Sequence, residues 1–331
     1  ELHGYSPASG DPAVKQELAE AVNRRYGTHF TGDNFYMTVG AAASLNITIQ
    51  ALTNSGDEFI VFAPFFPEYQ VWVENAGAVL RICPPNLKDF QMDFAELEKL
   101  LNPKTKGIII NSPNNPSGAV YSEETILRLS ALLEEKQKEY GTQIYLITDE
   151  PYREIVYGGV AVPYVTKYYA NTIVCYSYSK SLSLPGERIG YIIVPDEVTE
   201  SKKVMAAVNG AGRALGYVCA PVLFQKVVAK CTGVTGDISA YERNRELLYN
   251  GLTELGYECV QPQGAFYLFV KSPEPDANAF SEKAKKYDVL IVPGDSFGCP
   301  GYVRISYCVA EKTIVDAMPA FAKIMEEYRS V

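Results

Sequence analysis

The sequence has only two histidines, His3 and His29, and both lie near its start. A histidine-rich metal site is therefore excluded, and a Ser-His-Asp triad is disfavoured because its general base is a histidine. An enzyme of this composition that moves protons needs another base. Lysine is the obvious candidate.

The cysteines give no sign of a disulfide framework or a zinc site. None of the seven forms a CxxC pair, and the chain of 331 residues is too long for a small disulfide scaffold. Most lie inside apolar runs, as reduced core cysteines do. We therefore expect a cytoplasmic protein. The cysteines are Cys83, Cys175, Cys219, Cys231, Cys259, Cys299 and Cys308.

The charge pattern and the apolar runs exclude two further classes of protein. The net charge is −9 and no block of like charges occurs, which argues against nucleic-acid binding through phosphates. The longest apolar runs have the length of strands, so we predict no transmembrane helix. A hydrophobic content of 47% in 331 residues allows a large core and favours two domains.

The stretch from Thr172 to Arg188 is the most informative part of the chain. Thr172–Tyr176 is a β-rich run that ends in the hydroxyl residues Ser177 and Ser179, followed by Lys180. Lys180 alone could be a solvated loop lysine. The polar strand end and a second cation at Arg188 favour an anion site, since ligands of open α/β sheets bind at the carboxyl ends of strands.

Predicted strands alternate with helices through the first two thirds of the chain. This pattern predicts an α/β fold with a mostly parallel sheet and flanking helices. The carboxyl ends of parallel strands lie at one edge, so we expect the residues that follow the strands to converge. Taken singly, these residues have ordinary interpretations as turns, caps or core packing. They are Gly40–Ala42, Phe66, Asn115, Asp149 and Ser177–Lys180.

The composition changes near residues 210–221, and the remaining pattern predicts a smaller α+β domain. We place the large domain at residues 1–220 and the small domain at residues 221–331. A hairpin is predicted from Tyr257–Gln261 and Ala265–Val270 with its turn at Gln263-Gly264, and a strand at 289–292.

Four motifs in order resemble those of fold type I, pyridoxal-phosphate-dependent aminotransferases of class I/II, the aspartate aminotransferase superfamily. They are the S-Y-S-K run ending at Lys180 with G-E-R-I-G-Y after it, N-P-S-G at 115–118, D-E-P-Y at 149–152, and Y-S-P-A-S-G at 5–10. The resemblance covers nearly the whole chain. It implies a transferase of amino-acid metabolism that uses pyridoxal 5'-phosphate.

The resemblance also implies a role for each motif residue. Lys180 bonds to the cofactor aldehyde and then serves as general acid and base. Asp149 binds the pyridinium nitrogen, and Phe66 stacks on the ring. Asn115 and Tyr152 bind the phenolic oxygen. The implied phosphate ligands are Gly40, Ala41, Ala42, Ser177, Ser179, Arg188 and, from the partner subunit of a homodimer, Tyr5.

Substrate binding is assigned in the same way. The segment around Arg304 looks like the family's carboxylate-binding region, so Arg304 is expected to hold the α-carboxylate, beside Asn115. Arg213 follows Lys180 at roughly the interval seen in dicarboxylate-specific relatives and could bind a second carboxylate. Otherwise Arg213 packs at the domain junction, and the pocket suits aromatic or aliphatic substrates.

The resemblance therefore predicts transamination of an α-amino acid with a 2-oxo acid, with aspartate or glutamate and 2-oxoglutarate as candidates. Two alternatives remain open: a carbon–sulfur β-lyase or related synthase with the same cofactor, and a non-catalytic regulatory domain. The chain begins at Glu1, and a few dozen residues precede the Tyr5 segment in the family. We expect this N-terminal family segment to be missing here.

Overall fold

A seven-stranded sheet forms the centre of the structure, which is a computed structural model that describes residues 3–329. The neighbouring strands from β3 to β6 pair in parallel, whereas β7 is antiparallel to both β6 and β1. The predicted α/β fold with a mostly parallel sheet is confirmed. Across the sheet the strands are β1 (Phe35–Thr38), β7 (Gly190–Ile193), β6 (Thr172–Ser177), β5 (Tyr145–Asp149), β4 (Thr105–Asn111), β2 (Glu58–Phe62) and β3 (Val79–Cys83).

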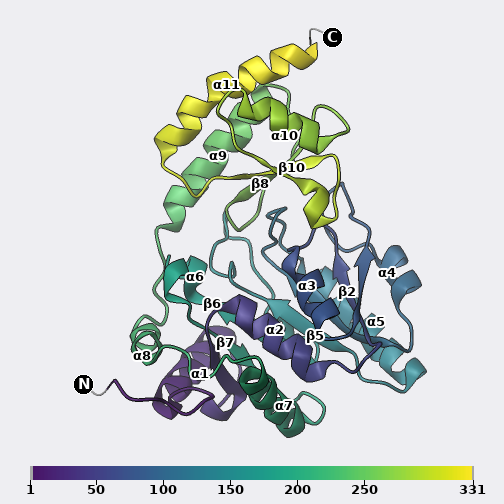
Figure 1. The fold of residues 1–331 in the computed structure, drawn as a ribbon, viewed down its shortest axis with the longest axis vertical. Helices are drawn as coiled ribbons and strands as arrows, with labels where there is room; N and C mark the ends of the chain where they lie inside the picture. The colour runs from purple at the N-terminus through teal and green to yellow at the C-terminus, as the bar shows by residue number, and fades with distance from the viewer. Residues whose placement is uncertain (1–2, 330–331) are drawn as a thin grey trace.

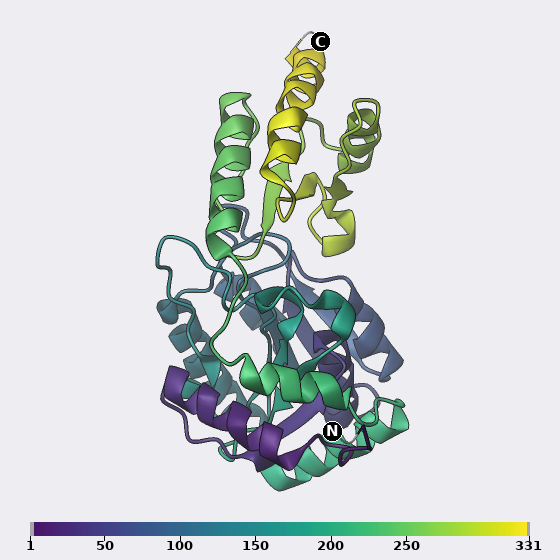
Figure 2. The same ribbon diagram turned by 90° about the vertical axis from the view of Figure 1, so that its left-hand side faces the viewer.

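Helices cover both faces of this sheet (Figures 1 and 2). One face packs against α2 (Ala41–Leu52), α3 (Glu68–Asn75) and α7 (Ser201–Ala214). The other face packs against α1 (Pro12–Tyr26), α4 (Phe94–Leu100), α5 (Glu123–Tyr140) and α8 (Val222–Lys230). The sheet is thus buried on both sides, as mostly parallel sheets are.

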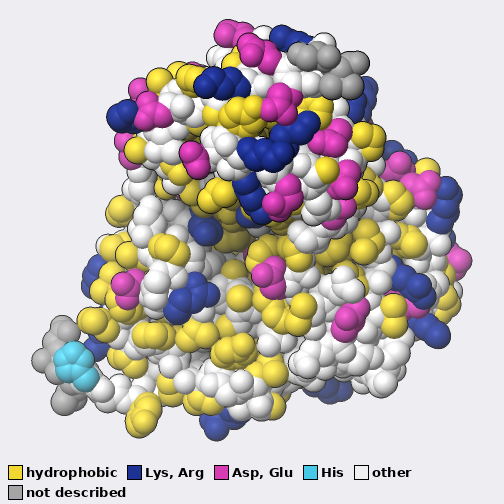
Figure 3. Space-filling view, turned by 45° about the horizontal axis from the view of Figure 1, so that its top comes forward, with side chains coloured by type: hydrophobic (Ala, Val, Ile, Leu, Met, Phe, Trp, Pro, Cys, Tyr) yellow, Lys and Arg dark blue, Asp and Glu magenta, His cyan; other side chains and the backbone are white. Residues whose placement is uncertain are grey.

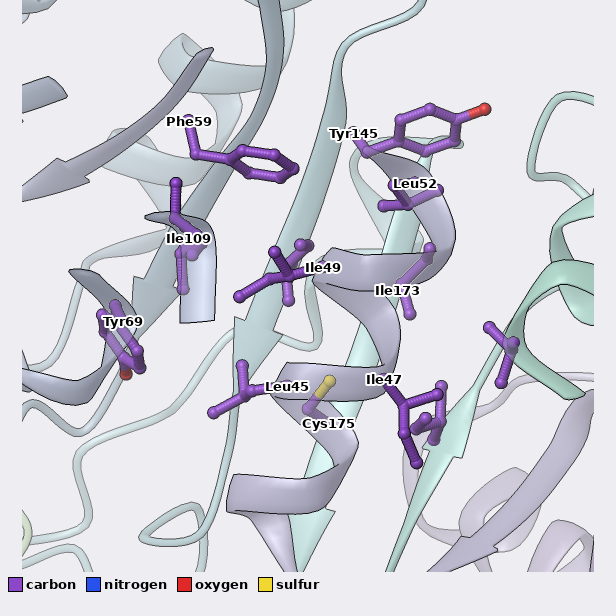
Figure 4. Packing of buried hydrophobic residues seen from close by; sticks show 14 of the residues in the cluster. Leu45, Ile47, Ile49, Leu52, Phe59, Tyr69, Ile109, Tyr145, Ile173 and Cys175 are labelled. Carbon is purple, nitrogen blue, oxygen red and sulfur yellow. The ribbon is translucent and has the colours of Figure 1, made fainter. Parts of the chain in front are cut away.

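Alternate residues of the inner strand β6 pack on the two faces of the sheet. Ile173 and Cys175 lie in the cluster beneath α2, where Figure 4 shows Cys175 beside Leu45 and Ile173 nearer to Leu52. Val174 and Tyr176 belong to the cluster beneath α1. This period of two follows from strand geometry. Because both faces of β6 are buried, the strand is held in one register. Its carboxyl end and the residues that follow it are therefore held in place.

Capping residues and glycines mark the ends of the helices α1 and α5. Asp11 caps α1, because its side-chain oxygen accepts the N–H of Ala13 at 2.9 Å, and α1 ends at Gly27 in the left-handed region. Ser122 caps α5 in the same way, and Gly141 ends it. These caps set the lengths of the helices that cover the face opposite α2.

The smaller part contains a three-stranded antiparallel sheet, shown above the larger part in Figure 1. The predicted hairpin is wrong in one arm: residues 257–261 form no strand, and Cys259 makes only an isolated bridge to Val270. The predicted strand at 289–292 is displaced to Val292–Pro293. The elements are β8 (Tyr267–Lys271), β9 (Val292–Pro293), β10 (Tyr302–Ser306), α9 (Ile238–Glu254), α10 (Ala277–Lys285) and α11 (Glu311–Arg329).

The helix α8 bears on where the two parts divide. Its residues Val228 and Ala229 are buried in one cluster with α1, which belongs to the larger part. The fully buried Gln225 also accepts the backbone N–H of Asp11 at 2.8 Å. We therefore propose a boundary between α8 and α9 in place of the one predicted at residue 220.

Candidate active site

Most of the predicted ligands line one cavity of about 320 Å³. It lies where the carboxyl ends of β4, β5 and β6 meet β8 and β10 of the smaller part. Figure 3 shows the surface hollowed between the two parts, with Lys or Arg side chains beside the hollow. The predicted residues that line it are Ala41, Ala42, Phe66, Asn115, Asp149, Tyr152, Ser177, Ser179, Lys180, Arg188 and Arg304.

A second cavity, of about 390 Å³, lies between α1 and the loop at residues 231–235. Tyr176 and Tyr178 line it, but none of the predicted ligands does. Convergence of titratable and polar groups is the better guide to an active site than size. We therefore take the smaller cavity as the candidate active site.

Lys180 lies on α6 (Tyr178–Ser181), the single helical turn that follows β6. Ser177 caps this turn by accepting the N–H of Ser179 at 3.2 Å. Burial lowers the pKa of Lys180, and the nearby guanidinium groups of Arg188 and Arg304 act in the same direction, against the thiol of Cys308. A lysine with a lowered pKa supplies the neutral amine that a general base requires.

One end of the cavity is built to bind an anion. Gly40 caps α2 with φ at 97°, and the first N–H groups of a helix have no partner within it. A Cβ at Gly40 would lie 2.7 Å from Nη2 of Arg188, so only glycine leaves room for this guanidinium. Arg188 also donates to the carbonyl of Pro185 at 2.8 Å, and Ser179 lies beside it. These groups suit a phosphate.

Asp149 also lines the cavity. It is the last residue of β5 and is buried, and its Oδ2 accepts the hydroxyl of Tyr69 at 2.6 Å. Its Oδ1 is buried without a hydrogen-bond partner among the described residues. Burial raises the pKa of Asp149 to about 7, which the Tyr69 bond partly opposes. A cationic partner in the cavity would satisfy Oδ1 and favour the carboxylate.

Asn115 and Arg304 meet at the side wall. Nη1 of Arg304 donates to Oδ1 of Asn115 at 2.9 Å. The backbone N–H of Asn115 is held by Oδ1 of Asn111 at 2.7 Å, which fixes the turn after β4. The side-chain oxygen of Asn115 is therefore engaged by Arg304. Its NH₂ group remains the donor for a ligand.

Tyr152 lies in the segment after β5 and reaches the smaller part. Its hydroxyl is 3.1 Å from the hydroxyl of Tyr267, the first residue of β8. The guanidinium carbon of Arg304 lies 4.5 Å from the centre of the Tyr267 ring. Tyr152 and Tyr267 both line the cavity, so each part of the molecule supplies a wall of the site.

Sequence reasoning missed several residues of the site. Tyr69 follows Phe66 by three positions, an interval that puts both on one face of a helix, and this spacing could have suggested it. Tyr267 and Trp72 gave no local signal, because their role depends on contacts between distant segments. Asn111 ends β4 in the position where Asp149 ends β5, with which it pairs in register, and this could have been noticed.

Three predicted residues do not line the cavity of a single chain: Gly40, which precedes the lining residue Ala41, and the more distant Tyr5 and Arg213. Tyr5 is 97% exposed in the segment before α1. Arg213 is exposed near the end of α7 and does not line the cavity. Their assigned roles stay predictions, and that of Tyr5 requires a second subunit.

Comparison with known proteins identifies the family. A sequence model described as aminotransferase class I and II matches residues 1–321. The chain belongs to the class I and II aminotransferases. Enzymes of this family use pyridoxal phosphate, which is therefore the cofactor of this aminotransferase.

Individual relatives agree in sequence and in structure. The chain is 31% identical to the aspartate/prephenate aminotransferase of Thermus thermophilus, over 97% of this chain and 83% of that protein. It is 29% identical to aromatic-amino-acid aminotransferase 2 of Thermococcus litoralis, over all of this chain and 86% of that one. A crystal structure of an amino transferase from Eubacterium rectale superposes with a TM-score of 0.97 at 63% identity, covering 98% of this chain and 82% of that one.

The residues in the cavity fit pyridoxal phosphate. The unpaired Oδ1 of Asp149 matches the protonated pyridine nitrogen, and the glycine-bounded space beside Arg188 matches the phosphate. Both groups line the same cavity as Lys180.

Proposed function

We propose that this aminotransferase transfers the amino group of an α-amino acid to a 2-oxo acid in the cavity around Lys180. One observation carries the proposal: a lysine of lowered pKa, an unpaired buried carboxylate and two guanidinium groups line the same cavity. Each group has a chemical task in amino transfer, and a simple binding site would not need the unpaired carboxylate.

We assign each residue a role that its surroundings support. When bound, pyridoxal phosphate supplies the electron sink that stabilises the charge left at the substrate Cα. Asp149 supplies the negative charge that keeps the ring nitrogen protonated. Arg304 holds the substrate α-carboxylate, which needs a planar pair of donors. Nζ of Lys180 takes the proton from Cα as general base and returns a proton as general acid.

The remaining ligands orient the cofactor. Gly40, Ala41 and Ala42 offer backbone N–H groups to the phosphate, and Ser177, Ser179 and Arg188 add side-chain donors. Asn115 and Tyr152 donate to the phenolic oxygen, and Phe66 covers the ring. Tyr152 is held by Tyr267, and Asp149 by Tyr69, so both are fixed before a ligand binds.

The amino donor depends on the second cation. Among the described residues that line the cavity, the guanidinium groups are those of Arg188 and Arg304, and Arg188 faces the phosphate end. A donor such as aspartate or glutamate therefore needs Arg213 from a second subunit. Without it, the aromatic wall of Phe66, Trp72 and Tyr267 suits a neutral donor.

The two kinds of donor can be separated by one variant. If Arg213 pairs with a second carboxylate, Arg213→Ala lowers kcat/KM for aspartate by about 100-fold and for phenylalanine much less, because a buried charge then goes unpaired. Lys203, an exposed lysine in the first turn of the same helix, gives the control variant Lys203→Ala. An equal loss of kcat/KM for both amino acids would contradict the dicarboxylate hypothesis.

A screen of amino acids tests the function itself. Purified protein with cofactor is mixed with each amino acid, and both the change in cofactor absorbance and the 2-oxo acid released are recorded. Release of thiol or ammonia without return of the amino group to pyruvate or 2-oxoglutarate would instead support the β-lyase alternative. Binding to DNA in a gel-shift assay, with no turnover, would support the regulatory alternative.

We propose a homodimer in which each site includes Tyr5 of the other subunit, and a cytoplasmic location. The exposure of Tyr5 supports the first proposal, and the unpaired state of all seven cysteines supports the second. Within residues 3–329, none of the helices has the length and apolar character needed to span a membrane.

A further inference from the structure

Tyr267 contacts both Tyr152 and Arg304 but has no assigned role. It is 8% exposed, and its hydroxyl lies 3.1 Å from that of Tyr152. The two rings meet edge to face, with centroids 5.9 Å apart. Tyr152 belongs to the larger part and Tyr267 begins β8 of the smaller part. This contact therefore joins the two parts inside the cavity.

Arg304, the proposed ligand of the substrate carboxylate, packs on the face of the Tyr267 ring. The guanidinium of Arg304 lies 4.5 Å from the ring centre, a distance typical of a cation–π contact. Residue pairing explains the placement: β10 runs antiparallel to β8 with Ser306 opposite Tyr267, so Arg304 is its diagonal neighbour on the same face. The contact is thus fixed by sheet register rather than by a flexible side chain.

We propose that Tyr267 is a positioning residue that couples the carboxylate-binding Arg304 to the hydroxyl of Tyr152. Its ring holds the guanidinium, and its hydroxyl orients the Tyr152 hydroxyl toward the cofactor. Binding of a substrate carboxylate at Arg304 then changes the hydrogen bond from Tyr152 to the phenolic oxygen of the cofactor, and Tyr267 transmits this change. The proposal rests on the function proposed above.

The direction of the hydrogen bond follows from the surroundings. Either hydroxyl of the pair has the geometry to donate. The guanidinium of Arg304 lies over the ring of Tyr267, and this nearby positive charge makes the Tyr267 hydroxyl the better donor. If it donates to Tyr152, the proton of Tyr152 is left to point into the cavity. The charged or titratable groups around the pair are Tyr69, Asp149, Lys180, Arg304 and Cys308.

The variant Tyr267→Phe tests this coupling because it removes the hydroxyl and keeps the ring. The absorbance of the bound cofactor is titrated with pH, without any amino acid present. Weaker donation by Tyr152 destabilises the negative phenolic oxygen, so the midpoint should shift upward by about half a unit to one unit. We expect kcat to fall about 3- to 10-fold and the KM for amino acids to change less than 2-fold, since Arg304 keeps its support.

Tyr267→Ala separates the two tasks, because it also removes the ring beneath Arg304. It should raise KM at least 10-fold in addition to the shift of the midpoint. Tyr157→Phe is the matched control: Tyr157 is also buried and its hydroxyl donates to the carbonyl of Ala265, but it does not line the cavity. It should lower Tm without moving the midpoint.

A double variant decides whether Tyr267 acts through Tyr152. In the Tyr152→Phe background, Tyr267→Phe should add no further shift. An unchanged midpoint in Tyr267→Phe, or a full additional shift in the double variant, would overturn the proposal. The titration needs only the bound cofactor, so a protein that titrates normally but transfers no amino group would refute the proposed function and leave the coupling still measurable.

Discussion

Asp149 lowers the stability of the folded protein when no cofactor is bound. Its carboxylate is buried, one oxygen has no partner among the described residues, and burial raises its pKa to about 7. The folded chain therefore holds a proton there more tightly than the unfolded chain does. The stability that this proton provides is present at low pH and is lost as the pH rises through about 7.

Asp149→Asn should consequently stabilise the cofactor-free protein. The expected gain in the free energy of unfolding is about 4 kcal/mol at pH 8 and about 2 kcal/mol at pH 5, from the difference between the two pKa values. Urea unfolding at both pH values measures it. A gain that does not grow with pH would contradict the assigned ionisation.

The same substitution should damage catalysis. An amide cannot hold the protonated ring nitrogen by charge, so removal of the Cα proton should slow by several kcal/mol, on the order of 10³-fold or more. Single-turnover rates with a saturating amino acid measure this step. Rates close to those of the native protein would remove Asp149 from the mechanism, whatever its effect on stability.

Lys180 gives the third prediction at the residue scale. Borohydride should fix the cofactor covalently to the native chain but not to Lys180→Ala, which should still bind it through the phosphate ligands. Lys203→Ala serves as the control, because Lys203 is an exposed lysine paired with Glu200. Mass spectrometry of peptides locates the label, and a label on any other lysine would refute the assignment.

The sequence was sufficient for residues whose neighbours in the chain reveal them. Lys180, Asp149 and Asn115 follow strands directly, so a parallel sheet brings them together without further information. Tyr69 and Tyr267 could not be assigned, because the hydrogen bonds that define them join residues 80 and 115 positions apart. Contacts of that kind are products of packing, which a local pattern does not contain.

At the scale of elements, the turn into α2 carries the anion site. Gly40→Ala should displace the guanidinium of Arg188, since the new Cβ would lie 2.7 Å from Nη2. We expect the affinity for pyridoxal phosphate to fall about 10- to 100-fold, the cost of one charged hydrogen bond. Fluorescence titration of the cofactor-free protein measures the affinity.

Gly56→Ala is the matched control for this substitution. Gly56 has a similar positive φ of 86°, but a Cβ there would meet nothing within 4 Å. Both variants should lose about 1 kcal/mol of stability from backbone strain. Only Gly40→Ala should lose affinity for the cofactor. Equal losses of affinity would mean that strain, not the contact with Arg188, is responsible.

Elements were predictable where their pattern is strong and were missed where tertiary contacts replace it. The helices α1 and α5 begin after the caps Asp11 and Ser122 and end at Gly27 and Gly141, residue types that mark helix ends in a sequence. The predicted strand at 257–261 is reduced to an isolated bridge from Cys259 to Val270, whereas β8 pairs along its length with β10. Tyr257 is buried with Phe280 in the core of the smaller part, a contact between distant segments that the local sequence does not reveal.

At the scale of the whole molecule, the site draws on both parts of the chain. Asp149 and Lys180 come from the larger part, whereas Arg304 and Tyr267 come from the smaller one. The segment that carries Tyr5 is anchored on the larger part: Gln225 of α8 binds Ser6 and Asp11. Tyr5 itself projects from this anchored segment and is 97% exposed. Such a side chain is placed to contact a second copy of the chain.

Mixing two damaged chains tests whether the sites are shared. In a symmetric dimer, Lys180→Ala chains lack the base, and Tyr5→Ala chains lack a phosphate ligand for their partner. A hybrid dimer contains one site with both defects and one native site, formed by the intact Lys180 of one chain and the intact Tyr5 of the other. After unfolding and refolding the mixture, transamination should rise toward about a quarter of the native rate, since half of the randomly paired dimers are hybrids with one native site.

His3→Ala, altered in the same exposed segment, replaces Tyr5→Ala in the control and should show no defect of its own. If the mixture is no more active than the average of its two components, or if sedimentation finds an active monomer, Tyr5 does not reach across an interface.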